Sequence, residues 1–425
     1  MEPEVFPTVS NLFSAIDSPE FAGLQCARRG NPNRANNQVS MLWMITIDIG
    51  DSMKNKPAVL AVLAATATIF SSAPATQAAP APQPAAQKVL AKGLVAPLHL
   101  SVGYDRSVLV SEEFAGRLVR IASNGARSVV YENAAWDVAG SDRQRGTIFF
   151  AASQGAGPMD PRPLAGHIHS IDSNGKHRMF GDLAALEKKE NADGGVQYGF
   201  RNLPAACAAQ LPKDVPVSYK GDVDSHPYGI EVAGSKVYVA DAGANSIVSV
   251  DVKSGKTKTV AVLPARPHRV TAAQAAALKM PACIVGHTYR FESVPTDVTV
   301  GPDGWLYVSS LPGGPEDPAL GARGAVFRVN PHSGKVRLFA DRVMSPTGIE
   351  TDADGNVYVA SLFGKGVLRI DDDSRKQQVL LPAKLAADVD LRGDTLYATV
   401  NALPEPKKAP DGRVVSIPLT GHRDD

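Results

Sequence analysis

Three aspartates recur at matching places in a repeated phrase of this sequence and could together bind a cation. Aligning the repeats puts one residue of each at the same height: His99, Asp137, Gly229, Asp297, Gly348 and Asp388. Carboxylate oxygens that converge on an axis suit a hard cation such as Ca²⁺, which could polarise a substrate or activate water. Alternatively, each aspartate accepts hydrogen bonds from backbone amides of its own repeat or the next. Asp137, Asp297 and Asp388 are therefore candidate metal ligands for Ca²⁺ or another divalent cation, and His99 is a candidate catalytic residue.

His226 is a second candidate catalytic residue, and Tyr228 follows it closely in the sequence. Both lie where a long insertion re-enters the repeated region, so they could supply an acid–base group and a stacking surface. The competing interpretation is a surface histidine in a loop that ends at Pro227. His167 and His169 alternate on one strand, but without a third ligand nearby they do not predict a metal site.

Loop residues supply the remaining binding candidates. Asp241 and Asn245 begin a loop in the third repeat, and Glu112 and Glu113 occupy the matching place in the first. Trp136 is a further binding candidate. In the alternative interpretation, Asp241 and Asn245 only shape their loop. The sequence contains no Gly-x-Ser-x-Gly elbow, His-Glu-x-x-His motif or phosphate-binding loop, so no standard catalytic motif names a reaction.

The elements that would position these residues are short strands with a period of two. The clearest strand of each repeat alternates apolar and small or aromatic residues at 107–111, 147–151, 236–240, 305–309, 356–360 and 395–399. A second strand follows each of these, and Gly-containing turns separate many of the strands. Four-stranded units of this size, repeated in tandem, are typical of a β-propeller. The sequence predicts an all-β fold, a six-bladed β-propeller of four-stranded antiparallel blades.

The sixth repeat predicts how the ring closes. Its third strand ends near Ile417, and only residues up to Asp425 follow. Residues 87–91 precede the first repeat and resemble a fourth strand, so we expect them to complete the last blade from the N-terminal side. An unpaired blade edge would expose a row of backbone donors and acceptors. An unordered N-terminal tail is the alternative.

Long insertions concentrate in the loops that share one face of a propeller. They are the loops between second and third strands at 153–165, 311–324 and 401–412, and the blade-to-blade loops at 182–225 and 263–294. Long loops on one side of a rigid scaffold usually carry function. We therefore expect a binding face there, with neutral variation of loop length as the alternative.

Cys207 and Cys283 lie in the two longest insertions, which flank the third repeat on that face. In an exported protein, two cysteines on neighbouring loops favour a disulfide. A pair of buried free thiols is the alternative.

The first part of the chain is predicted to direct export. Residues 53–79 combine a short basic segment, an apolar stretch and small residues near Ala78, which is the pattern of a cleaved signal peptide. A buried helix or an uncleaved anchor is the alternative. Residues 1–52 are interpreted as a mis-assigned start or an unstructured leader, 80–86 as a linker and 87–425 as the propeller. The chain of 425 residues has a net charge of +1, which gives no electrostatic footprint for nucleic acid.

Several phrases resemble the ScyD/ScyE family of exported bacterial β-propellers, which is similar to NHL-repeat and gluconolactonase-like propellers. They are HPYGIEV at 226–232, VYVADAGANS at 237–246, PTDVTVGPDG at 295–304 and PTGIET at 346–351. The resemblance covers about residues 87–420 and implies a propeller fold without an assigned biochemical role. Gluconolactonase-like enzymes hold a divalent metal with a glutamate early on the first inner strand. Residues 97–102 contain no glutamate, which argues against a lactonase.

Taken together, these features predict a secreted or cell-surface monomer with no transmembrane segment in its mature chain. The first functional hypothesis is a ligand-binding or scaffold protein that uses its loop-rich face, with a small molecule, a glycan or a protein as the partner. The alternative is a metal-assisted hydrolase or lyase with its site at the mouth of the central channel.

Overall fold

The computed structural model describes residues 87–157, 160–213, 215–405 and 407–419. The signal segment predicted at 53–79, the segment before it and the linker at 80–86 lie outside the described residues. In the described part of the chain, no helix is long and apolar enough to cross a membrane.

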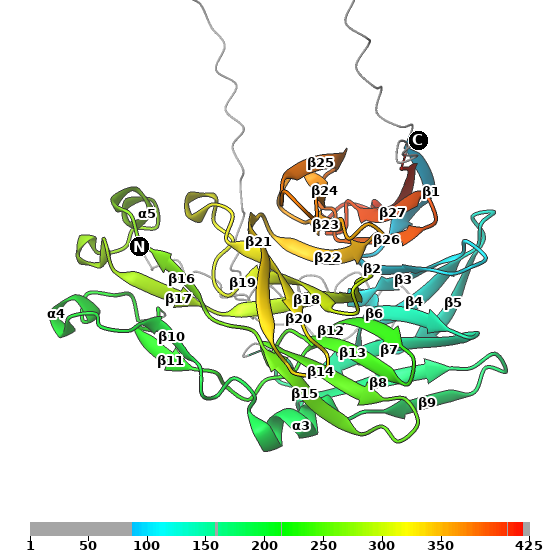
Figure 1. Cartoon of the computed structure of the whole chain (residues 1–425), viewed down its shortest axis with the longest axis horizontal. Coiled ribbons are helices and arrows are strands. Elements are labelled where there is room, and N and C mark those ends of the chain that lie inside the picture. The colour runs from blue at the N-terminus through cyan, green and yellow to red at the C-terminus, as the bar shows by residue number, and fades with distance from the viewer. Residues whose placement is uncertain (1–86, 158–159, 214, 406, 420–425) are drawn as a thin grey trace, which may run out of the picture. The chain divides into compact units, whose positions relative to one another are not determined.

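Six four-stranded antiparallel sheets form the blades (Figure 1). Blade one consists of β2 (Pro97–Val102), β3 (Val108–Glu112), β4 (Arg117–Ile121) and β5 (Arg127–Glu132). Blade two consists of β6 (Asp137–Gln144), β7 (Thr147–Gln154), β8 (Ala165–Ile171) and β9 (His177–Phe180). Blade three consists of β12 (Pro227–Ala233), β13 (Lys236–Asp241), β14 (Ser246–Asp251) and β15 (Thr257–Val262).

The second half of the chain repeats the same plan. Blade four consists of β18 (Ser293–Val300), β19 (Leu306–Pro312), β20 (Gly324–Val329) and β21 (Val336–Val343). Blade five consists of β22 (Pro346–Thr351), β23 (Val357–Ser361), β24 (Gly366–Ile370) and β25 (Gln377–Pro382). Blade six consists of β26 (Asp388–Arg392), β27 (Thr395–Val400), β28 (Gly412–Pro418) and β1 (Lys88–Leu94).

The period-two pattern places apolar side chains on both faces of each blade. In β13, Val237 and Val239 pack into the cluster shared with blade two, whereas Tyr238 and Ala240 pack into the cluster shared with blade four. Neighbouring blades therefore bury one another's faces, and a single blade could not do so alone. This packing explains why both faces of a strand such as β13 are apolar.

The first strands of the six blades contact one another in a closed cycle, in the order β2, β6, β12, β18, β22, β26 and back to β2. This cycle defines the six-bladed propeller that the repeats predict. The N-terminal strand closes the last blade, because β1 pairs antiparallel with β28, with Lys88 opposite Ser416 and Val89 opposite Val415 (Figure 1). Both the fold class and the closing strand are confirmed.

The two longest insertions, which the sequence predicts as loops, build a seventh sheet. It consists of β11 (Ser218–Lys220), β10 (Gln197–Phe200), β17 (Thr288–Phe291) and β16 (Arg266–Arg269), in that order. We call it the added sheet. Short helices accompany the propeller and the added sheet: α3 (Leu183–Glu190), α4 (Ala205–Ala208), α5 (Ala272–Ala277), η1 (Glu113–Ala115), η2 (Ala282–Ile284) and η3 (Pro318–Leu320).

The disulfide predicted between Cys207 and Cys283 is present and joins the two insertions, with 5.8 Å between the Cα atoms. It packs in an apolar cluster with Phe200, Val270 and Ile284. The added sheet therefore has a small hydrophobic core of its own, fixed by a covalent link between the two halves of the sheet.

Candidate functional site

A cavity of about 510 Å³ lies between the added sheet and the loops of blades two, three and four. Its wall on the side of the added sheet is apolar and includes Phe200, Val270, Met280, Ile284 and Phe291. Its polar lining includes Asp137, Asp193, Asp224, His226, Asn245 and Glu292. The volume falls in the range of small-molecule sites. We call this cavity the loop-side pocket.

His99 and His226 come together around one buried carboxylate, that of Glu113 in η1. The Nε2 atom of His99 lies 4.0 Å from Glu113 Oε2, and the Nε2 atom of His226 lies 4.0 Å from Glu113 Oε1. All three residues are buried. The ring of Tyr228 packs edge-on against His99 at 4.3 Å and lies 5.5 Å from that of His226. Residues from three separate segments, which carry His99, Glu113 and the pair His226 and Tyr228, thus form one cluster.

This cluster stands between two cavities. His226 lines the loop-side pocket, whereas His99 lines a second cavity of about 760 Å³ in the central channel. Burial lowers the pKa of His99 to about 3, with His226 adding to the effect, and it lowers the pKa of His226 to about 4, with help from Arg162. Both imidazoles are therefore neutral near pH 7 and can accept a proton or a hydrogen bond.

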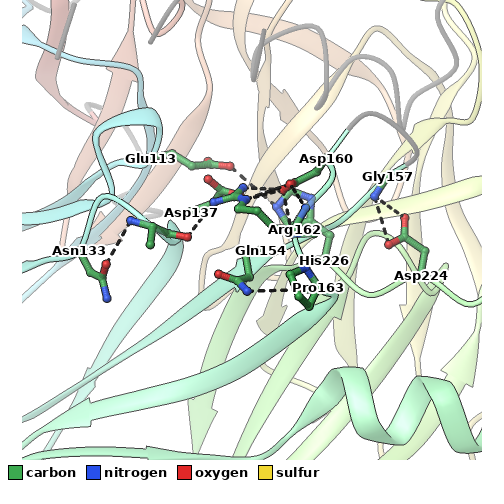
Figure 2. Close-up of polar contacts among 12 residues, drawn as sticks. Glu113, Asn133, Asp137, Gln154, Gly157, Asp160, Arg162, Pro163, Asp224 and His226 are labelled. Atoms are coloured by element: carbon green, nitrogen blue, oxygen red, sulfur yellow. Dashed lines mark hydrogen bonds and ion pairs between the residues drawn. The ribbon is translucent and has the colours of Figure 1, made fainter. Parts of the chain in front are cut away.

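Arg162 organises the polar floor beside His226 (Figure 2). Its guanidinium donates to Asp160 from Nε at 2.9 and 2.8 Å, to Asp137 Oδ2 at 3.1 Å and to the carbonyl of Ala135 at 2.7 Å. Burial alone would raise the pKa of Asp160, but the hydrogen bonds from Arg162 hold that pKa below its usual value. Asp137 therefore belongs to an ion-pair network at the loop-side pocket.

Asp297 and Asp388 tie neighbouring blades together. Asp297 Oδ2 accepts from the backbone N–H of Ile349 at 2.9 Å, and Asp388 Oδ2 accepts from that of Leu100 at 2.7 Å. The other oxygen of each accepts from the next residue of its own strand at 2.8 Å. This geometry is the alternative stated above for the repeated aspartates.

Asp137 does not share the position of Asp297 and Asp388. Asp297 pairs with Ser309 and Asp388 with Thr399, the residues that align with Ala151 in β7. Asp137 instead pairs with Ser153, nearer the end of that strand. Gly140 occupies the place instead, because a Cβ there would lie 2.7 Å from the carbonyl oxygen of Tyr228 in the next blade. The first strands β2, β12, β18 and β22 have the same irregularity, so the repeats do align, and Asp137 precedes the matching residue, Gly140.

The three candidate metal ligands therefore do not surround one point. Among the residues that the structure describes, no group of three or more His, Cys, Asp or Glu side chains is arranged to hold a metal ion. The residues present thus do not fit the Ca²⁺ site considered from the sequence.

The channel cavity is nevertheless acidic. Its lining includes Asp142, Glu231, Asp297, Glu350, Asp388 and Asp390. Burial, followed by repulsion among the carboxylates, raises the pKa of Glu231, and burial together with neighbouring carboxylates raises those of Asp297 and Asp390 to about 7. Several of these groups are therefore held partly protonated near neutral pH.

Other predicted residues serve the loops. Asp241 accepts from Ser225 Oγ at 2.7 Å and from the backbone N–H of His226 at 2.7 Å, so it positions the segment that carries His226. Glu112 accepts from the backbone N–H of Val95 at 2.8 Å and pairs with Arg117 at 2.7 Å. Both are buried and line neither cavity.

The remaining histidines of the prediction form an aromatic group apart from the pocket. The ring of Trp136 lies 5.8 Å from that of His167 and 6.0 Å from that of His169. His169 Nδ1 lies 2.9 Å from the Nε2 atom of His177. These rings pack along the face of blade two and line neither cavity.

Asn245 does line the loop-side pocket, and the structure pairs it with two residues that the sequence did not single out. Its amide donates to Asp193 at 2.8 Å and to Glu292 at 3.3 Å. Asp193 follows α3, and Glu292 stands between β17 and β18. Asp193 lies 52 residues from Asn245 and Glu292 lies 47 residues from it, so no local motif could have revealed the group.

Comparison with protein-family models finds no match, and comparison with curated proteins finds none either. Solved structures of similar fold include virginiamycin B lyase from Staphylococcus aureus, at 17% identity over 74% of this chain and 80% of that chain, with a TM-score of 0.42.

Two further structures are the gluconolactonase XC5397 from Xanthomonas campestris and the PQQ-bound aldose sugar dehydrogenase from Streptomyces coelicolor. The first shows 15% identity over 79% of this chain and 89% of that chain, with a TM-score of 0.46. The second shows 13% identity over 79% of this chain and 99% of that chain, with a TM-score of 0.46. Likeness at this level carries no information on activity.

Proposed function

We propose that this propeller is a binding protein whose loop-side pocket holds a small molecule. The observation that carries the proposal is the pocket itself, a cavity of about 510 Å³ with an apolar wall and a polar floor. Apolar walls with a few placed polar groups are typical of ligand sites, because the walls supply burial and the polar groups supply orientation.

The way the wall is built supports this assignment. The added sheet contributes Phe200, Tyr289 and Phe291 to the lining and is fixed by the disulfide between Cys207 and Cys283. Because a covalent link joins the two insertions that form this sheet, the sheet presents a preformed surface, and a ligand need not order it on binding. An insertion without a binding role would have no reason to place an apolar surface over a cavity.

We also propose that the protein is exported, as the predicted signal segment and the resemblance to the ScyD/ScyE family imply. The disulfide supports export, because such bonds persist mainly in oxidising compartments.

A compound screen by thermal shift tests the binding proposal. A ligand of the pocket stabilises the folded state by RT ln(1 + c/Kd), where c is its free concentration, so the shift grows with the logarithm of that concentration above Kd. Leu278 lines the pocket, so Leu278→Trp should fill part of it and abolish the shift, whereas Leu338→Trp on exposed β21 should not. A shift that survives Leu278→Trp, or the absence of any hit in a broad library of metabolites and glycans, would argue against the pocket.

The second candidate function is an enzyme, and the pairing of His99 and His226 on Glu113 favours it. A neutral His226 at the pocket floor could accept a proton from a substrate, and Glu113 could stabilise the imidazolium that forms. The reaction class considered from the sequence is a hydrolase or lyase assisted by a metal.

A panel of esters, lactones and lyase substrates tests this candidate. Loss of about a hundredfold or more in rate in His226→Gln, with full rate in the exposed variant His332→Gln, would support acid–base catalysis. Activity that a chelator abolishes would point to the metal-assisted form instead.

A further inference from the structure

Two carboxylates of the loop-side pocket, one buried and one half-buried, share a single amide donor. Asn245 Nδ2 donates to Asp193 Oδ2 at 2.8 Å and to Glu292 Oε2 at 3.3 Å, and the hydroxyl of Tyr198 donates to Asp193 Oδ2 at 2.9 Å. Asp193 is 1% exposed and Asn245 is 2% exposed. Three segments of the chain therefore converge on one polar point of the pocket.

Two acceptor atoms at this point lack donors. Within the part of the chain that the structure describes, Asp193 Oδ1 and Asn245 Oδ1 are buried and accept no hydrogen bond. Buried acceptors without partners are rare, because each one loses its hydrogen bonds to water without compensation. Both residues also line the pocket, so these unpaired acceptors lie at its polar end.

The electrostatics of the point favour a cation. The charged groups that act most strongly on Asp193 and Glu292 are further carboxylates, Asp222 and Asp224 among them, and burial together with these charges raises the pKa of both carboxyl groups. Lys220 also lines the pocket but is exposed. A positive group on a ligand would therefore meet an excess of negative charge.

The apolar wall beside these polar residues indicates that the cation belongs to a larger, partly apolar ligand. The apolar wall formed by Phe200, Met280, Ile284 and Phe291 lines the same cavity as the three polar residues. A hydrated metal ion would gain nothing from an apolar wall. The amide nitrogen of Asn245 also donates to both carboxylates, which places a donor where a metal ion would need ligands. A protonated amine carries two or three N–H donors and can be joined to an apolar body.

We propose that Asp193, Asn245 and Glu292 form a subsite for the protonated amine of a ligand whose apolar body packs on the added sheet. The inference rests on the proposed binding function and names the class of its ligand: an amphipathic amine. Asp193 and Glu292 supply the charge, and the Asn245 amide, which donates to both, holds the two carboxylates in place.

Calorimetric titration of the full chain with three matched probes tests the subsite. The probes are 2-phenylethylamine, 2-phenylethanol and phenylacetate, which keep one apolar body and change the polar end from cation to neutral to anion. We expect the amine to bind at least about tenfold more tightly than the alcohol, because hydrogen bonds to charged groups are the strong ones. Phenylacetate should bind least.

Variants locate the preference. Glu292→Gln and Asp193→Asn remove one charge each while keeping shape, and either should bring the amine close to the alcohol in affinity. Asp373→Asn, at an exposed residue of blade five that does not line the pocket, is the matched control and should keep the preference. Thermal unfolding of each variant shows whether it is folded. If one of the two variants fails to fold, the other still tests the subsite.

The outcomes separate this inference from the proposed function. Equal binding of the alcohol and the amine overturns the subsite and leaves the pocket as a binding site. A preference that persists in both variants, or the failure of all three probes, also overturns the subsite, and the compound screen then decides the pocket. Binding of Ca²⁺ that Glu292→Gln abolishes would mean a metal site in place of an amine subsite.

Discussion

Asp388 in the last blade accepts a hydrogen bond from the backbone N–H of Leu100 in the first blade, at 2.7 Å. The bond crosses the point where the ring of blades closes, so its two residues lie 288 positions apart in the sequence. Asp297 makes the equivalent bond to Ile349 between blades four and five. The repeated aspartate thus joins blades, and this role accounts for its recurrence.

Removing this bond should loosen the ring at its closure. Asp388→Ala leaves the amide of Leu100 buried without an acceptor, so we expect a loss of about 1–3 kcal/mol in the free energy of unfolding. Urea unfolding measures it. Asp373→Ala, at an exposed aspartate in a turn of blade five, is the control and should change stability little. Equal effects of the two substitutions would mean that the bond contributes nothing.

The closing strand offers a second test, with a control in the same strand. Leu94 of β1 is 1% exposed and packs in the core, whereas Val89 is 48% exposed. Leu94→Ala should cost about 2–5 kcal/mol through lost burial and a residual cavity, and Val89→Ala should cost far less. Similar small effects at both positions in urea unfolding would show that β1 does not hold the last blade.

The acidic channel should make stability depend on pH. The folded-state pKa values of Asp297 and Asp390 are raised to about 7, above those of the unfolded chain. Proton binding by these two groups therefore stabilises the folded state. This contribution to the free energy of unfolding is full below about pH 4 and is lost as pH rises through about 7. His99 and His226, whose pKa values are lowered, oppose this trend below about pH 6.5.

Glu231→Gln isolates the channel from the histidines. Burial and the neighbouring carboxylates raise the pKa of Glu231, so the variant removes one charge that the folded state disfavours. Compared with the unchanged protein, its Tm should be higher at about pH 8 and nearly equal at about pH 5. A lower Tm at both pH values would show that Glu231 is stabilising as an anion, contrary to the expectation.

The disulfide should matter most for the added sheet. It closes a segment with a sequence separation of 76, and in the chain-entropy model such a loop contributes about 4 kcal/mol. The double variant Cys207→Ser and Cys283→Ser should therefore lose protection from amide hydrogen exchange in β10, β11, β16 and β17 first. If exchange rises equally in all six blades, the added sheet is not a separate cooperative unit.

The sequence predicts the blades and their closure well, because each β-strand carries its own alternation. Val237 and Val239 point one way and Tyr238 and Ala240 the other, and this local pattern survives in the fold. Cys207 and Cys283 could be paired because few cysteines are present. These signals are short-range or depend on counting residues.

The site could be predicted only in part. His99, His226 and Tyr228 stood out by residue type, yet nothing in the sequence shows that they meet at Glu113. Asp137 was aligned with Asp297 and Asp388, but it pairs with Ser153 of β7, and Gly140 stands at the matching position. The added sheet could not be predicted, because strands as short as the three residues Ser218–Lys220 carry too little alternation to be recognised.

A structure of the protein with a bound compound from the screen tests the central claim most directly. We expect the compound in the loop-side pocket, between the added sheet and His226, with its polar end at Asn245. A compound bound instead in the central channel among Asp297, Glu350 and Asp390 would contradict the account and move the functional site to the axis of the propeller.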